Sequence, residues 1–222
     1  MKIDILTLFP EMFSGFINES IIKRARNSGK VEIEIHNIRD YSPFKNGQVD
    51  DYPFGGGPGM VLMCEPIFNA IEHLKKDNTK VVMLTPSGEV FNQKLSYEMS
   101  KLEHIILLCG HYEGFDERIK TIIDMELSIG DYVLTGGEVP AMVVTDSVVR
   151  LIPGVISNES LDTESFSDDL LDYPVYTRPE VFRGMKVPEV LLSGHHKNIA
   201  NYREEERIRI TKEKRGDLYR GD

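Results

Sequence analysis

The sequence LSIGDYVLTGGEVP, at residues 127–140, decides the fold class of this chain. It opens on the end of an apolar run, and glycines follow at positions 130, 136 and 137. Glycine lets the backbone turn with positive φ and approach a ligand closely. A second stretch, LLCGHYEGFD at residues 107–116, has the same build of apolar strand, glycine, aromatic residue and acid. We therefore expect two strand ends that open together into one pocket.

Apolar segments alternate with segments of helical periodicity on both sides of these stretches. Strands are predicted at residues 3–8, 31–35, 80–84 and 105–108, the third ending at the TPSG sequence of residues 85–88. Helices are predicted at residues 12–25, 66–75, 92–102, 116–124 and 140–151. Because most of the strands are apolar throughout, this alternation indicates an α/β fold with a mainly parallel sheet.

The carboxyl ends of parallel strands are where such sheets bind ligands. Pro86, Gly110 and Gly130 each lie at a strand end, so three loops are expected around one crevice. An apolar pocket with open backbone suits adenine and a methionine-like arm better than a triphosphate. Its walls can come from Leu84, Ile129, Tyr132, Val133, Leu134 and Pro140, although each of these could equally belong to the core.

Several other kinds of site fit poorly. Residues 40–60 form a polar loop rich in glycine and proline, long enough to suspect a function. Its GGGPGM segment, residues 55–60, lacks both the ending of a phosphate-binding loop and the spacing of a dinucleotide motif, so a hinge is the simpler interpretation. The sequence has no histidine and cysteine cluster with zinc spacing and no Gly-x-Ser-x-Gly motif.

Composition limits the cellular context. The chain has 222 residues and a net charge of −10, which argues against a surface that binds nucleic acid everywhere. No apolar run reaches the roughly 18 residues that cross a bilayer. Cys64 and Cys109 lie in apolar contexts and are expected to be free thiols in a reducing compartment, which predicts a cytoplasmic protein.

The character of the sequence changes near residue 157. Residues 1–156 carry the α/β pattern. Residues 157–173 are polar and acidic, and we interpret them as a flexible interdomain linker. Residues 174–222 are expected to form a small unit that contains a charged helix at about 199–214.

Seven motifs then point to one family. They are VDD at 49–51, FGGGPGM at 54–60, GHYEGFDER at 110–118, SIGDYVL at 128–134, GGE at 136–138, DSVVR at 146–150 and YTRPE at 176–180. In these motifs, and from about residue 1 to residue 200, the chain resembles the bacterial tRNA (guanine-N1)-methyltransferases, which methylate the guanosine just 3′ of the anticodon, position 37. Two alternatives stay open: another RNA-modifying enzyme of the same superfamily, or a non-catalytic RNA-binding protein that retains the pocket.

The resemblance implies a SPOUT-type fold, with a trefoil knot that binds S-adenosylmethionine, and a homodimer with its active site at the subunit interface. It also implies a small helical tRNA-binding domain, shortened here because the relatives continue past the equivalent of residue 222. The cofactor-binding residues that it implies are Leu84, Pro86, Gly110, Tyr112, Glu113, Ser128, Ile129, Gly130, Asp131, Tyr132, Val133, Leu134, Gly136, Gly137 and Pro140. The implied RNA-binding residues are Asp50, Gly55, Gly57, Met60 and Arg178.

The catalytic residues follow from the chemistry of guanine and from the family pattern. Guanine N1 carries a proton at neutral pH, so a carboxylate base is needed, and a cation near O6 would stabilise the charge that develops there. The resemblance implies Arg150 as the cation. Many relatives have an aspartate before Ser-Phe in the linker, where this chain has Glu164; Asp162 is the alternative base. Mg²⁺ assisting N1 deprotonation is a further expectation, without an identified ligand set.

Overall fold

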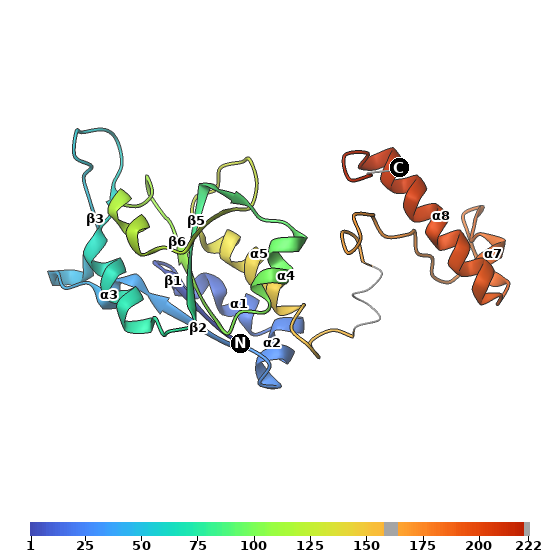
Figure 1. Ribbon diagram of the computed structural model, residues 1–222, viewed down its shortest axis with the longest axis horizontal. Helices are drawn as coiled ribbons and strands as arrows, with labels where there is room; N and C mark the ends of the chain where they lie inside the picture. The colour runs from blue at the N-terminus through green and yellow to red at the C-terminus, as the bar shows by residue number, and fades with distance from the viewer. Residues whose placement is uncertain (158–163, 220–222) are drawn as a thin grey trace. The chain divides into compact units, whose positions relative to one another are not determined.

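The computed structural model describes residues 1–157 and 164–219 (Figure 1). The chain divides into two compact units, Met1–Ile156 and Ser157–Asp222. The first unit holds the sheet and most of the helices, and the second holds the long helix near the C-terminus. Each unit is described by itself. The cofactor pocket predicted from the glycine-rich stretches lies entirely within the first unit.

Five parallel strands form the centre of the first unit. They are β1 (Lys2–Thr7), β2 (Glu32–Asn37), β5 (Thr79–Val90), β6 (His104–Cys109) and β7 (Met125–Ser128). The sheet order is β2-β1-β6-β5-β7, and every pairing is parallel. All six residues of β6 are buried, as expected for a central strand of a sheet that is covered on both faces. The α/β fold with a parallel sheet is thus confirmed, whereas the trefoil knot stays a prediction.

Two layers of helices cover the sheet. One layer consists of α1 (Ser14–Ile17), α2 (Ser20–Asn27), α4 (Gln93–Met99) and α5 (Glu138–Val149), whose apolar side chains pack on Ile3, Ile5, Ile105 and Leu107. The other consists of α3 (Cys64–Leu74) with the 3-10 helices η2 (Ile38–Tyr41) and η4 (Glu117–Ile122), which pack on Leu6, Val81, Ile106 and Leu108. Alternate residues of a strand point to opposite faces, which explains how two separate cores share the same strands.

The predicted helix at residues 12–25 is wrong in detail. The chain forms the 3-10 helix η1 (Pro10–Phe13), then α1, and then α2 after a break at residues 18 and 19. Ser20, at the start of α2, has a φ of 51°, so α1 and α2 cannot continue as one α-helix. The guanidinium of Arg26 donates to the Ile17 carbonyl at 2.7 Å and to Asn18 Oδ1 at 3.2 Å, so a side chain satisfies the acceptors that the break exposes.

The predicted end of the third strand is also wrong, because β5 continues through Pro86 to Val90. Its pairing with β7 is interrupted between Leu84 and Glu89. Proline has no N–H to donate to a neighbouring strand, and Pro86 is tolerated because the hydrogen bonds to β7 are interrupted at this point. The interruption lies beside the carboxyl end of β7, where it opens the sheet edge toward the predicted pocket.

The 40–60 loop contains structure that its composition did not indicate. It holds the end of η2, the 3-10 helix η3 (Lys45–Gly47) and the strand β3 (Asp50–Asp51), which pairs with β4 (Val61–Leu62). Residues 52–60 form the tip of this hairpin, which Figure 1 shows extending beyond the rest of the unit. The Phe54 side chain at the tip is fully exposed.

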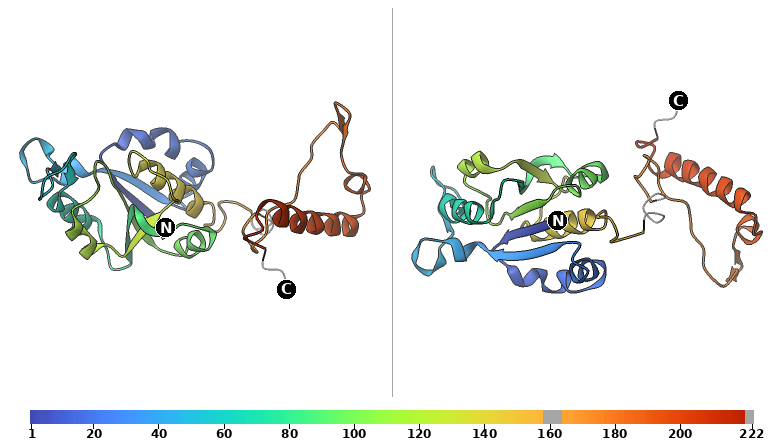
Figure 2. Two further views of the ribbon diagram at one scale, coloured as in Figure 1. Left: turned by 90° about the horizontal axis from the view of Figure 1, so that it is seen from above. Right: turned by 60° about the horizontal axis from the view of Figure 1, so that its bottom comes forward.

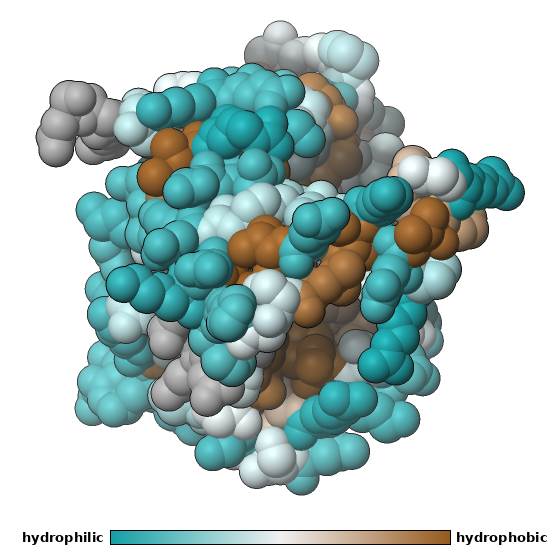
Figure 3. Space-filling model, turned by 90° about the vertical axis from the view of Figure 1, so that its right-hand side faces the viewer, coloured by the Kyte–Doolittle hydropathy of each residue, from teal (hydrophilic) through white to brown (hydrophobic). Residues whose placement is uncertain are grey.

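The second unit contains one long helix and several short elements. They are the antiparallel pair β8 (Val181–Phe182) and β9 (Met185–Lys186), the short helix α7 (Glu189–Leu192) and α8 (His196–Lys214), which both views of Figure 2 show. Arg207 of α8 is nearly buried and pairs with Asp168 and Glu204, which fixes residues 168–171 to the helix. Several hydrophobic side chains of this unit are exposed, among them Val181, Phe182 and Met185. The space-filling view of Figure 3 shows hydrophobic residues exposed among hydrophilic ones.

None of the helices in the described part of the chain combines the length and the apolar character needed to cross a lipid bilayer.

Candidate active site

A pocket of about 430 Å³ lies at the carboxyl ends of β6 and β7 and beside the interrupted stretch of β5. Three segments surround it: residues 85–87 of β5 and the loops that follow Cys109 and Ser128. The start of α5 closes the remaining side through Pro140. This is the edge at which ligands of parallel α/β sheets bind.

Fourteen of the fifteen residues predicted to bind the cofactor line this pocket. They are Leu84, Pro86, Gly110, Tyr112, Glu113, Ser128, Ile129, Gly130, Tyr132, Val133, Leu134, Gly136, Gly137 and Pro140. Asp131 is exposed and does not line it. His111, Phe115, Lys120 and Thr135 line the pocket without having been predicted. His111 and Thr135 lie within the two glycine-rich stretches, so their position was the signal that could have identified them.

Gly137 allows two of the loops to touch. Its N–H donates to the Gly110 carbonyl at 2.8 Å. A Cβ on Gly137 would lie 2.6 Å from Cys109 Cα, a distance that no real side chain tolerates. The two segments therefore pack backbone against backbone, and peptide groups rather than side chains form this wall of the pocket.

Backbone strain marks the loop that follows β6. Tyr112 has a φ of 59°, in the left-handed region that non-glycine residues rarely occupy. A hydrogen bond of 3.1 Å from the Gly114 N–H to the His111 carbonyl closes this turn. Strained residues persist where the surrounding structure fixes them, often at ligand sites. The turn leaves Tyr112 partly exposed at the pocket edge.

The hairpin carrying four of the predicted RNA-binding residues is attached to the pocket wall. The Glu113 N–H donates to the Met60 carbonyl at 3.0 Å, and the Leu62 N–H donates to the Gly114 carbonyl at 2.9 Å. Asp50, Gly55, Gly57 and Met60 all belong to this hairpin. Arg178, the fifth predicted residue, is exposed in the second unit.

Charged groups near the pocket are paired with one another. The Arg118 guanidinium donates to both carboxylate oxygens of Asp116, at 2.9 and 2.7 Å, and holds the pKa of that carboxyl well below its usual range. Lys120 lies 3.0 Å from Glu117 Oε1, and its hydrogen bond to that carboxylate raises the pKa of the ammonium. At neutral pH Lys120 is therefore a cation at the rim of the pocket.

The two predicted catalytic residues do not line the pocket. Arg150 directly follows the last residue of α5, whereas the pocket contacts the first turn of that helix. Twelve helical residues with a rise of 1.5 Å each separate the two ends by about 18 Å. Glu164 belongs to the second unit, and the alternative base Asp162 lies outside the described residues.

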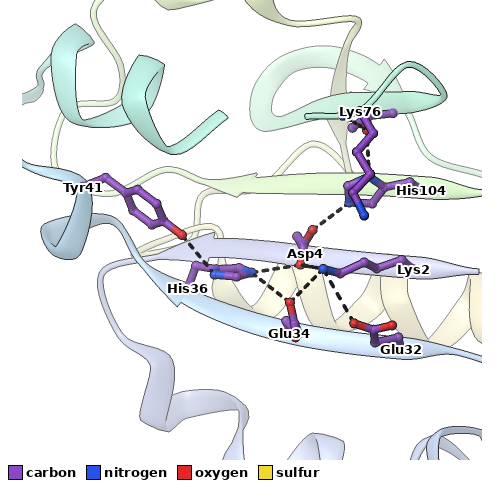
Figure 4. Close-up of polar contacts among 9 residues, drawn as sticks. Lys2, Asp4, Glu32, Glu34, His36, Tyr41, Lys76 and His104 are labelled. Atoms are coloured by element: carbon purple, nitrogen blue, oxygen red, sulfur yellow. Dashed lines mark hydrogen bonds and ion pairs between the residues drawn. The ribbon is translucent and has the colours of Figure 1, made fainter. Parts of the chain in front are cut away.

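Within the described ranges, one group of side chains has the spacing of a metal site, and it lies away from the pocket. Asp4, Glu34 and His36 hold their ligand atoms within 4.8 Å of one another. The Lys2 ammonium already lies 2.8 Å from Glu34 Oε2 and 3.3 Å from Asp4 Oδ1 (Figure 4). A cation of the protein itself therefore already pairs with both carboxylates of this group. The pocket residues do not provide a corresponding ligand set for Mg²⁺ in the described part of the chain.

Comparison with known proteins identifies the family. The family model described as tRNA (Guanine-1)-methyltransferase TrmD matches residues 1–221. A tRNA (guanine-N(1)-)-methyltransferase of Ureaplasma urealyticum is 58% identical over 220 residues, which cover 99% of this chain and 96% of the relative. The proteins of that name from Clostridioides difficile and Dictyoglomus turgidum are 57% and 55% identical, covering 99% and 98% of this chain and 98% and 89% of themselves. The chain therefore belongs to the tRNA (guanine-N1)-methyltransferase family and is an enzyme with the methyltransferase activity of that family.

Proposed function

We propose that this enzyme transfers a methyl group from S-adenosylmethionine to N1 of the guanosine 3′ of the anticodon, position 37, in tRNA. One observation carries the proposal: two strand ends that break into glycine and the interrupted stretch of β5 around Pro86 surround a single pocket, and family motifs line it. The other RNA-modifying chemistries that the sequence left open become outcomes of the test below.

The pocket suits the methyl donor in size and chemistry. Its volume of about 430 Å³ falls in the usual range for small-molecule sites. Leu84, Ile129 and Pro140 supply apolar walls for an adenine ring, and the free backbone groups of the glycine-rich loops can read its edge. When bound, S-adenosylmethionine supplies an electrophilic methyl group on a sulfonium.

The protein must remove the N1 proton and stabilise charge at O6. We assign the first role to Glu164, with Asp162 as the alternative, and the second to Arg150. A carboxylate in hydrogen-bond reach of N1 takes the proton as the new bond forms. A guanidinium beside O6 stabilises the charge that develops there, and holding the reacting atoms in line supplies much of the remaining rate.

The position of Arg150 favours a homodimer with a composite active site. Arg150 lies about one α5 length, roughly 18 Å, from the pocket of its own chain, too far for both to reach the same guanine. A second copy can supply the arginine. Val139 and Val143 are exposed on one side of α5, one helical turn apart, and Val133 and Leu134 are exposed at the pocket. Exposed apolar side chains of this kind mark interaction surfaces.

We assign tRNA binding to the hairpin and to the second unit. Met60 lies beside Glu113, and Gly55 and Gly57 belong to the same hairpin tip, so a nucleotide held near Met60 would also meet the pocket wall. Arg178 offers a guanidinium to a phosphate or a base. We expect the enzyme to act in the cytoplasm, where its tRNA substrate is made.

A methyl-transfer assay tests the proposal. The full-length chain is incubated with labelled S-adenosylmethionine and a tRNA transcript that has G at position 37, and a matched transcript with A at that position is the control. Label in the first tRNA alone is expected, at N1 of the guanine after nuclease digestion. Label at another atom or in both transcripts would indicate a different specificity.

Paired variants then identify the base. Glu164→Gln is expected to lose most of its turnover while retaining the affinity for S-adenosylmethionine, and Asp162→Asn is expected to retain both. The reverse result would assign the base to Asp162. Full turnover in both variants would exclude the linker carboxylates.

A further inference from the structure

Glu138 is a buried carboxylate beneath the pocket. It is the first residue of α5 and is 3% exposed. The Thr7 hydroxyl, at the end of β1, donates to Glu138 Oε1 at 2.7 Å, and Thr7 Oγ1 accepts the Phe9 N–H at 2.9 Å. Burying a carboxylate is unfavourable unless hydrogen bonds or a helix N-terminus compensate for the lost water. Such a group at this place needs an explanation beyond packing.

The second oxygen of Glu138 faces the pocket wall. A Cβ on Gly136 would collide with Glu138 Oε2 and would lie 2.8 Å from His111 Nδ1. The carboxylate oxygen and the imidazole nitrogen therefore border the same small space, which is open because residue 136 has no side chain. His111 Nδ1 is buried and has no hydrogen-bond partner in the described structure.

Both loops of the glycine-rich wall meet at this point. Gly137 donates to the Gly110 carbonyl at 2.8 Å, directly before His111 in the chain. Burial, and after it the negative charge of Glu138, raises the pKa of the Cys109 thiol well above its usual value. Glu138 thus lies close to the end of β6 as well as to the end of β1, but it does not line the pocket itself.

We propose that Glu138 is a positioning residue, whose carboxylate is fixed by Thr7 and holds His111 and the Gly136–Gly137 backbone in the arrangement that binds the methyl donor. The inference rests on the proposed function, because it assigns Glu138 to the S-adenosylmethionine site. Oε1 accepts from Thr7, which leaves Oε2 to accept from His111 Nδ1–H after a small rotation of either side chain, with or without a bound ligand. This contact satisfies the one buried imidazole nitrogen at the pocket that lacks a partner in the described structure.

Three variants of the full-length chain separate positioning from packing. Glu138→Gln retains an oxygen for Thr7 and gains an N–H₂ group that can donate to His111 Nδ1. Glu138→Leu fills nearly the same volume without any polar atom. Ser147→Ala is the matched control. Ser147 lies on α5, as Glu138 does, but away from the pocket, and the variant removes its 2.7 Å hydrogen bond to Ser96 of α4.

Calorimetry with S-adenosylmethionine gives the expected order. Loss of one buried hydrogen bond is expected to weaken binding about tenfold in Glu138→Leu, against less than about threefold in Glu138→Gln and Ser147→Ala. If Glu138 acted only by filling space, glutamine and leucine would have similar effects on affinity, so a near-normal affinity in Glu138→Gln alone supports the positioning role. Wild-type affinity in Glu138→Leu, or an equal loss in all three variants, would overturn the proposal.

A readout without ligand keeps the two proposals apart. The ¹⁵N resonances of the His111 imidazole and the exchange rate of the Gly137 amide are measured in the same variants. Both are expected to change in Glu138→Leu. In Glu138→Gln the exchange rate of the Gly137 amide is expected to stay near the wild type, whereas the His111 Nδ1 resonance is expected to move to that of a hydrogen-bonded acceptor, because Nδ1 then accepts from the glutamine amide. If the wild type binds no S-adenosylmethionine, the proposed function fails, and these two signals still decide the positioning role: unchanged signals in Glu138→Leu reject it.

Discussion

Two regions of the same sheet differ in how far the hydrogen-bonding groups of their side chains are satisfied. On the face covered by α3, the fully buried Asp4 accepts hydrogen bonds from His36 Nε2 at 2.9 Å and from His104 Nε2 at 2.7 Å (Figure 4). At the carboxyl ends of the strands, glycines replace side chains and His111 Nδ1 has no partner in the described structure. We call the first region the Asp4 network and the second the pocket.

In the Asp4 network each polar hydrogen has a hydrogen-bond acceptor. A carboxylate only accepts, so we assign both imidazoles the Nε2–H tautomer. Their Nδ1 atoms can then accept from the Tyr41 hydroxyl at 3.2 Å and from the Thr79 hydroxyl at 2.7 Å. Thr79 Oγ1 in turn accepts the Lys76 N–H at 2.8 Å. Polar groups that are all satisfied make the fold rigid, whereas unsatisfied groups collect where a ligand completes them.

Removal of the Asp4 carboxylate should give the largest effect on stability. Asp4→Ala leaves the Nε2–H groups of the buried His104 and the partly buried His36 without their acceptor, and it removes one of the ion pairs of Lys2. Breaking such a buried pair lowers the free energy of unfolding by about 3 to 5 kcal/mol. Denaturant titration measures this change, and calorimetry should find the S-adenosylmethionine affinity nearly unchanged in the folded variant.

The control for this experiment is Glu32→Ala. Glu32 is an exposed carboxylate 3.7 Å from the same Lys2 ammonium, and its loss should change stability by no more than about 0.5 kcal/mol. A comparable loss in both variants would mean that surface charge, and not the closed network, accounts for the effect.

One added methyl group in the pocket should have the opposite effect, a large loss of ligand affinity with a smaller loss of stability. Gly137→Ala places a Cβ 2.6 Å from Cys109 Cα, and the two loops must separate to admit it. Overpacking of this kind amounts to about 1 to 3 kcal/mol, and we expect it chiefly as a 10- to 100-fold loss of S-adenosylmethionine affinity. Gly15→Ala is the matched control, because a Cβ there meets nothing within 4 Å. Equal binding by both variants would contradict the backbone packing of the pocket wall.

The sequence was sufficient for the features that repeat locally. Apolar runs predicted β1 and β6, and glycines after strand ends predicted where the pocket opens, whereas the family resemblance supplied the full set of lining residues. Both signals act over a few residues, because strand burial and positive φ are local properties.

Features that depend on distant partners were missed. Thr7 and Glu138 are 131 residues apart, and no periodicity connects them. The break before α2 depends on Arg26 reaching back to Ile17, and the extension of β5 past Pro86 depends on an interrupted register with β7. The separation of Arg150 from the pocket, by contrast, follows from the length of the predicted helix at 140–151, and it supports the proposal of a second subunit.

Acid should weaken the Asp4 network before it affects the pocket walls. Burial raises the pKa of Asp4, but the hydrogen bonds from His36 and His104 outweigh it, and the pKa lies below its usual value. A carboxyl group whose pKa is lowered by folding stabilises the fold at pH values above about 3.9, its pKa in the unfolded chain. As the pH falls from there toward the pKa of the folded state, the free energy of unfolding decreases by at most about 1.4 kcal/mol per pH unit. Unfolding titrations between pH 5 and pH 3 should show this slope in the wild type and a smaller one in Asp4→Asn. An identical slope in both would assign the acid sensitivity to other carboxylates.

The smallest effect should come from the one cation of the Asp4 network. Lys2→Met removes an ammonium 3.3 Å from Asp4 Oδ1, but both imidazoles still donate to that carboxylate, and the lysine side chain is partly in water. We therefore expect a loss of only about 0.5 to 1 kcal/mol in the free energy of unfolding, together with a rise in the pKa of Asp4 that carboxyl NMR can follow. Lys80→Met, which removes a more exposed ammonium 3.8 Å from Asp124, is the control and should change stability less. If Lys2→Met instead approached the effect of Asp4→Ala, the ammonium and not the two histidines would hold the buried carboxylate, and the contrast with the open pocket would rest on charge instead of hydrogen bonding.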